Sequence, residues 1–94
     1  MNNHCFKKNK RVSTNTIDGI SFVYMEDTKE LLELDEVASF IWRQIDGNKM
    51  VSEIIANCIN CFKGDSNEIE TSVSNFFNTL ISEKLIKIQE NKND

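Results

Sequence analysis

The hydrophobic period of the chain changes within residues 31–42, and this change constrains the whole fold. Leu32 and Leu34 alternate with a charged residue, as on a pleated strand. From Val37 onward, apolar residues recur instead at helical intervals along one face. Asp35 stands at the junction, where its carboxylate can accept hydrogen bonds from the free N–H groups of a first helical turn, so we predict that it is the N-cap. The chain therefore passes from a strand directly into a helix.

Upstream of this junction the sequence predicts three strands joined by short turns. β-Branched residues favour a strand over residues 12–17, and Asp18-Gly19 is a strong signal for a two-residue hairpin turn. A second strand is expected over residues 20–25 and a third over residues 30–34. The residues that we expect on the core face of the second strand are Ile20, Phe22 and Tyr24.

Downstream of the first helix, apolar residues recur at helical spacing in two further segments. A second helix is predicted over residues 51–62. Asp65 followed by Glu68 resembles a capping box, which opens a third helix over residues 67–84. The apolar stripe of this helix consists of Ile69, Val73, Phe76, Phe77 and Leu80. The expected fold class is therefore α+β, a three-stranded antiparallel meander followed by three helices in a winged-helix-like arrangement.

Length and composition leave room for one hydrophobic core. The chain has 94 residues, of which 39% are hydrophobic, and it contains no proline. We expect one domain over residues 12–88, closed by a short strand at residues 85–88. Residues 1–11 are mostly polar and basic, with little to bury except Phe6, and are predicted to form a flexible arm; residues 89–94 are predicted to form a polar tail.

Charge and hydropathy argue against several classes of partner. The formal net charge of -4 disfavours nucleic acid, because proteins that bind phosphate backbones use clustered lysine and arginine. No apolar run reaches the roughly 18 residues that a membrane span requires, so we expect no membrane partner and a cytoplasmic protein. Three cysteines, an odd number, indicate reduced thiols. A chain of this size also leaves little space for a deep active site, which favours binding over catalysis.

The cysteines offer one chemical motif, which has two interpretations. Cys58 and Cys61 form a C-x-x-C pair, and with His4 and Cys5 they could supply four zinc ligands. However, Cys58 lies on the apolar stripe of the second helix, and His4 and Cys5 belong to the expected arm. Redox catalysis is a weaker alternative, because the pair lies late in a helix and not at a strand-to-helix turn. We therefore predict structural cysteines and no metal or other cofactor.

A strand hairpin combined with helices also permits a winged-helix interpretation, in which the third helix would read DNA. The first turns of that helix carry Glu68 and Glu70, and no lysine or arginine occurs there before Lys84. These carboxylates would repel phosphates. A DNA-binding transcriptional regulator is therefore kept as the alternative function.

The segment Leu31–Gly47, followed by Val51–Ile55, resembles the PqqD family. The family pattern is a strand that ends in Leu-Asn-x-x-Ala, then Ile, Asp-Gly and a Val-x-Glu-Ile helix. The matching residues are Leu34, Asp35, Ala38, Ile41, Asp46, Gly47, Val51, Glu53 and Ile54. Asp35 replaces the commoner asparagine, and Met50 stands where serine or threonine usually caps the second helix. The resemblance extends over about residues 12–88.

This resemblance implies a non-catalytic recognition domain for ribosomally made precursor peptides, which holds the leader segment and presents the peptide to a modifying enzyme such as a radical enzyme, a protease or a cyclase. The sequence agrees independently, because the third strand is an edge of the expected meander and can accept a further strand. We expect a groove between this strand and the third helix, with Leu31 as an anchor, although Val73 and Leu80 fit a core position equally well. The predicted peptide-binding residues are Glu30, Leu31, Leu32, Glu33, Leu34, Val73, Phe76, Phe77 and Leu80.

Overall fold

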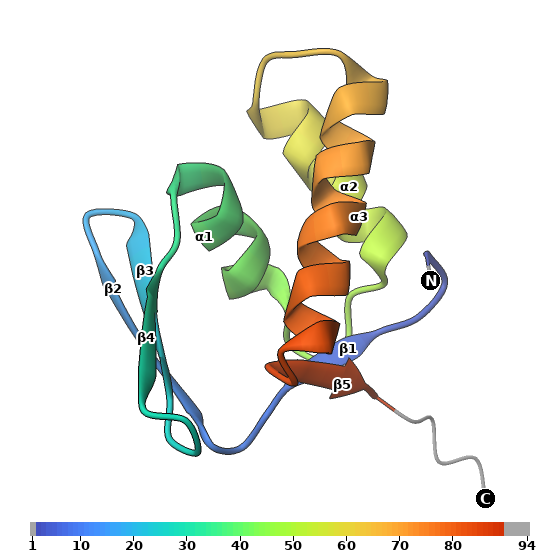
Figure 1. The fold of residues 1–94 in the computed structure, drawn as a ribbon. Helices are drawn as coiled ribbons and strands as arrows, with labels where there is room; N and C mark the ends of the chain where they lie inside the picture. The colour runs from blue at the N-terminus through green and yellow to red at the C-terminus, as the bar shows by residue number, and fades with distance from the viewer. Residues whose placement is uncertain (1, 90–94) are drawn as a thin grey trace, which may run out of the picture.

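The structure, a computed structural model, describes residues 2–89. Its elements are β1 (Phe6–Lys8), β2 (Val12–Ile17), β3 (Ile20–Met25), β4 (Glu30–Glu33), α1 (Glu36–Gln44), α2 (Val51–Cys61), α3 (Ser66–Ser82) and β5 (Ile86–Ile88). The strands β2, β3 and β4 form an antiparallel sheet in that order, and β1 pairs with β5 in a separate ribbon. Figure 1 shows the sheet beside α1, with α2 and α3 beyond it and the ribbon at the foot of α3. The predicted α+β meander followed by three helices is confirmed.

Local backbone chemistry explains why β2 turns back as β3. Asp18 and Gly19 both have positive φ angles, of 52° and 81°. A type I′ hairpin turn requires this conformation at both central positions, and glycine adopts it without steric cost. The turn fixes the register in which Ile17 lies opposite Ile20.

The core face of β3 is the opposite of the predicted one. The buried side chains of the strand are Ser21, Val23 and Met25, which are 0%, 1% and 7% exposed. Tyr24 is 36% exposed, and Phe22 and Ile20, which lie two and four residues before it on the same face of the strand, are only partly buried. The expected face, which carries the larger aromatic side chains, therefore points away from the helices.

Hydrogen bonds of Ser21 and Ser39 allow the polar residue Ser21 to lie on the buried face of β3. The Ser21 N–H donates to Ser39 Oγ at 2.8 Å, and the Ser39 hydroxyl donates to the carbonyl of Leu34 at 3.1 Å. The Ser21 hydroxyl is also bonded to Thr16 Oγ1 at 2.9 Å. A polar residue can be buried when its groups are paired in this way. Ser39 therefore ties α1 to both β3 and the end of β4.

Removing this link should lower stability measurably. Ser39→Ala leaves the buried N–H of Ser21 without its acceptor, so we expect a loss of about 1–3 kcal/mol in the free energy of unfolding, measured by urea denaturation. Ser82→Ala, in the exposed last turn of α3, is the control and should change stability by at most about 0.5 kcal/mol. Equal urea midpoints for the two variants would contradict the role of Ser39.

The start and the inner face of α1 follow the sequence closely. Asp35 Oδ1 accepts from the backbone N–H of Ala38 at 2.8 Å, which confirms the predicted N-cap. Trp42 is fully buried, and its indole N–H donates to Thr14 Oγ1 at 2.9 Å, joining α1 to β2. Phe40 is only partly buried. Trp42 is therefore the aromatic residue of α1 that reaches the core.

The prediction of a flexible arm is wrong for β1. Phe6 lies opposite Ile88 in the β1–β5 ribbon, is 4% exposed and has its ring centroid 5.6 Å from that of Phe77. Gln89 continues the contact, because its N–H donates to the carbonyl of Cys5 at 2.8 Å. The rest of the predicted polar tail, residues 90–94, lies outside the described residues.

Candidate functional site

The free edge of the main sheet is the first component of the site. In the strand order β2-β3-β4, β4 pairs with β3 on one side, and among residues 2–89 no strand pairs with its other side. All four residues of β4, Glu30–Glu33, are exposed. An edge strand of this kind presents backbone N–H and C=O groups that can pair with an extended peptide.

The register of β4 decides which of its side chains face the helices. Leu32 lies opposite Val23, and Leu31 lies opposite Tyr24. Because Val23 is buried under the helices and side chains alternate along a strand, Leu32 faces the helices and Leu31 faces away. Leu31 is 65% exposed and Leu32 is 38% exposed. The expectation that the Leu31 side chain points into a groove beside the third helix is therefore wrong, and Leu32 takes that direction.

Three of the predicted groove residues on α3 belong to the core. Val73, Phe77 and Leu80 are 0%, 0% and 2% exposed, so they offer almost no surface to a peptide, although Val73 lies at the bottom of the pocket described below. Leu34, which directly follows β4, is also buried at 7% exposed. Their place in an accessible groove is contradicted by this burial. They support the site from beneath, because they fix the position of α3.

The side chains at the margin of the α3 stripe remain accessible. Ile69 and Phe76 are only partly buried and lie seven residues apart, which places them on one side of the helix. Val37, in the first turn of α1, is 36% exposed and lines the same pocket as Ile69. These accessible residues of α1 and α3, together with Leu32 on the helix-facing side of β4, are the surface that we propose a bound strand would meet, and we call them the groove residues: Leu32, Val37, Ile69 and Phe76. Only two of them, Leu32 and Phe76, are among the site residues predicted from the sequence.

A pocket of about 220 Å³ lies between the first turn of α1 and the first turns of α3. Its apolar lining comes from Val37, Phe62, Ile69 and Val73, and its polar lining includes Lys63, Asp65, Glu68 and Ser72. Asp65 is fixed there because its carboxylate caps α3, accepting from the N–H of Asn67 at 2.9 Å. In the sequence, the Asp65…Glu68 capping pattern indicates where α3 begins, but it does not indicate that a pocket lies beside this helix start.

A second, larger cavity of about 850 Å³ lies near the two ends of the described chain and has a mainly polar lining. Its lining residues are Asn3, His4, Cys5, Asp46, Gly47, Asn48, Ile88 and Gln89. The backbone N–H of Asn48 and the side chain of Lys49 lower the pKa of Asp46 to about 2. Its carboxylate is thus engaged in shaping the α1–α2 turn.

The possible zinc ligands do not come together. The backbone of Cys5 forms an isolated antiparallel β-bridge with Met50, the residue before α2. Cys58 and Cys61, in contrast, lie in the last turns of that helix. With a rise of about 1.5 Å per residue, the eight residues from Met50 to Cys58 separate the two pairs by roughly 12 Å along the helix. Within the described part of the chain, no group of three or more histidine, cysteine, aspartate or glutamate side chains is arranged to hold a metal ion.

The two thiols of the C-x-x-C pair should differ strongly in reactivity. Cys58 is fully buried, and this burial, with a smaller effect of the neighbouring Cys61, raises the pKa of the Cys58 thiol to about 11. Because the thiolate is the reactive form, iodoacetamide at pH 8 should label exposed Cys61 and leave Cys58 unlabelled in mass spectrometry. All three cysteines should react in denaturant. Equal labelling rates for Cys58 and Cys61 in the folded protein, or about one zinc ion per chain in elemental analysis, would contradict the structural role.

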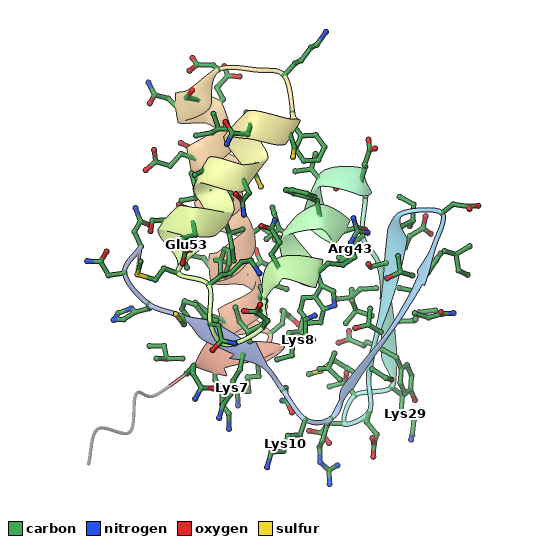
Figure 2. The ribbon with its side chains drawn as sticks, turned by 180° about the vertical axis from the view of Figure 1, so that it is seen from behind. Lys7, Lys8, Lys10, Lys29, Arg43 and Glu53 are labelled. Carbon is green, nitrogen blue, oxygen red and sulfur yellow. The ribbon has the colours of Figure 1, made fainter. Side chains whose placement is uncertain are left out.

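The distribution of basic side chains does not match a DNA-reading α3. The first turn of α3 contains Glu68, and the helix contains no lysine or arginine. Figure 2 shows Lys7, Lys10 and Lys29 along the end of the molecule opposite the α2–α3 turn.

In residues 2–89, no helix is both long enough and apolar enough to cross a membrane.

Comparison with known proteins identifies the family. The family model described as coenzyme PQQ synthesis protein D (PqqD) matches residues 21–86. The chain belongs to the PqqD family. A relative from Xanthomonas campestris pv. campestris (strain B100), named PqqA binding protein, is 30% identical over 60 residues. That alignment covers 64% of this chain and 65% of the relative, so it spans less than two thirds of the relative's length.

Two solved structures share the fold of this PqqD-family chain. TbiB1 in complex with the TbiA(beta) leader peptide has a TM-score of 0.78 and 22% identity, and the match covers 93% of this chain and 99% of that one. Lasso peptide synthetase B1 complexed with the leader peptide has a TM-score of 0.77 and 11% identity, with 87% and 96% covered. The fold expected from the resemblance to the PqqD family is therefore confirmed.

Proposed function

We propose that this protein binds the leader segment of a ribosomally made precursor peptide as an added strand on β4 and presents the peptide to a modifying enzyme. The observation that carries the proposal is the exposed, unpaired edge Glu30–Glu33 beside the groove residues. Backbone pairing supplies affinity that does not depend on peptide sequence, and apolar side chains in the groove select the peptide's anchors. The names of the compared proteins, a PqqA binding protein and two leader-peptide complexes, support the same kind of partner.

The proposed role is that of a non-catalytic adaptor. Its enzyme partner is a peptide-modifying enzyme, such as a radical enzyme, a protease or a cyclase. A ribosomally made precursor is synthesised in the cytoplasm, so we propose that the encounter takes place there. DNA binding is less well supported, because the net charge is -4 and the first turn of α3 is acidic.

Backbone amide shifts test the proposal directly. The ¹⁵N-labelled protein is titrated with the leader of the precursor peptide encoded nearest to its gene. We expect the largest shifts along Glu30–Glu33, where new backbone hydrogen bonds form, and smaller shifts at Ile69 and Phe76. Binding that leaves the β4 amides unchanged would overturn the proposed mode.

A proline scan of the same leader supplies the control for strand addition. Proline in the middle of the bound segment removes one backbone donor and clashes with the ladder, so affinity should fall by at least about tenfold. Alanine at the same peptide position, where its side chain points to solvent, should change affinity by less than about twofold. If proline and alanine are tolerated equally, the leader does not bind as a strand.

A further inference from the structure

The pocket beside the start of α3 lies where a strand bound to β4 would leave the sheet. The chain passes from Glu33 through Leu34 and the Asp35 cap directly into α1, and Val37 in that first turn lines the pocket. A peptide that runs along β4 and continues in the direction of Glu33 therefore meets the pocket within a few residues. Figure 1 shows the first turn of α1 and the α2–α3 turn at the same end of the molecule.

The volume and lining of the pocket suit one long side chain. Its volume of about 220 Å³ corresponds to roughly seven waters of bulk liquid, which is room for one side chain and not for a folded element. The apolar lining from Val37, Phe62 and Ile69 can cover an aliphatic stem. A side chain that enters would therefore bury its methylene groups before its tip reaches polar groups.

The charged lining of the pocket is acidic on balance. Asp65 and Glu68 contribute two carboxylates, and Lys63 contributes one opposing ammonium group. The start of α3 adds a partial positive charge of about half a unit, so that, with Lys63 counted, the pocket keeps a net negative charge of about half a unit. Glu36, next to Val37 in the chain, is a further exposed acidic residue at the start of α1. An uncharged apolar side chain in the pocket would displace the water that hydrates these carboxylates and would offer them no hydrogen bond in return, which costs free energy.

We propose that this pocket binds a long cationic side chain of the leader peptide, preferentially arginine, with its stem against Val37 and Ile69 and its guanidinium group paired with Asp65 and Glu68. Arginine is preferred over lysine because its planar fork can donate to two carboxylates at once. This inference rests on the proposed leader binding and specifies its substrate class, a peptide in which a basic residue follows or precedes the apolar strand segment.

A randomised peptide library tests this selectivity without knowledge of the natural precursor. An mRNA-displayed library of random 15-residue peptides is selected on the full chain, and enriched peptides are synthesised with arginine or with norleucine, an uncharged residue with an aliphatic stem, at the enriched position. We expect arginine at a constant distance from an apolar anchor, and about fivefold or more weaker binding with norleucine. With the Glu68→Gln protein the difference between the two peptides should shrink to about twofold.

Glu70→Gln is the matched control. Glu70 is exposed on the same helix but lies two residues, or about 200°, around from Glu68, and it does not line the pocket. This variant should bind both peptides as the parent protein does. Enriched peptides without a basic residue, or an equal effect of norleucine on the parent and Glu68→Gln, would overturn the inference. Peptides that shift the β4 amides without an arginine preference would leave the proposed function standing, whereas failure to enrich any peptide would overturn both.

Discussion

Replacing Trp42 with alanine is expected to cost about 3–5 kcal/mol in the free energy of unfolding. Trp42 is fully buried, and its indole N–H donates to Thr14 on β2. The ammonium group of Lys8 lies 4.7 Å from the centre of its ring, so Trp42 also contacts β1. One side chain thus joins α1 to the sheet and to the β1–β5 ribbon. Because a domain of this size is stable by about 5–15 kcal/mol, most of the stability should be lost.

Urea denaturation followed by far-ultraviolet circular dichroism measures this loss, because Trp42 is the only tryptophan and its fluorescence disappears with the mutation. Phe40→Ala, on the same helix, is the control. Phe40 is only partly buried and packs edge-on against Phe62 with ring centroids 5.3 Å apart, so its loss should cost roughly half as much. Equal urea midpoints for Trp42→Ala and the parent would show that α1 is placed wrongly.

The parts of the fold that depend on local chemistry could be predicted from the sequence. Asp35 caps α1 because its carboxylate reaches the N–H of Ala38, three residues away. Asp18-Gly19 turns the β2–β3 hairpin because both residues adopt positive φ. In each case, residues within four positions of one another carry the signal. The change from strand period to helix period at Asp35, between β4 and α1, then fixes the order of the remaining elements.

The parts that depend on contacts distant in sequence could not be predicted. β3 is apolar on both faces apart from Ser21, so alternation alone did not decide which face is buried. The decision comes from Ser39, eighteen residues further on, which accepts from the buried N–H of Ser21. The burial of Phe6 likewise depends on β5, about eighty residues away. In isolation, a single phenylalanine in a basic segment indicates an arm.

The candidate site was predicted at the level of elements and only partly at the level of residues. The centre of the α3 stripe, around Val73 and Phe77, faces the core, whereas its margin at Ile69 and Phe76 stays accessible. Periodicity identifies the apolar stripe of α3 but does not indicate which of its residues stay accessible to solvent. For β4 the signal was present: Leu32 shares the parity of buried Leu34, and Leu31 does not.

This parity yields a prediction with a large expected effect on peptide binding. Leu32→Asp places a carboxylate on the side of β4 that faces the helices, among the groove residues, where a bound leader would bury it without a partner. We expect leader affinity, measured by isothermal titration calorimetry, to fall by at least about tenfold.

Leu31→Asp is the matched control, because it makes the same change on the adjacent residue of the same strand. Its side chain is 65% exposed and faces away from the helices, so affinity should change by less than about threefold. Thermal melts of both variants establish that each is folded before titration. If the two variants bind equally well, or if Leu31→Asp is the weaker binder, the leader does not lie on the helix-facing side of β4 but contacts the outer face of the sheet.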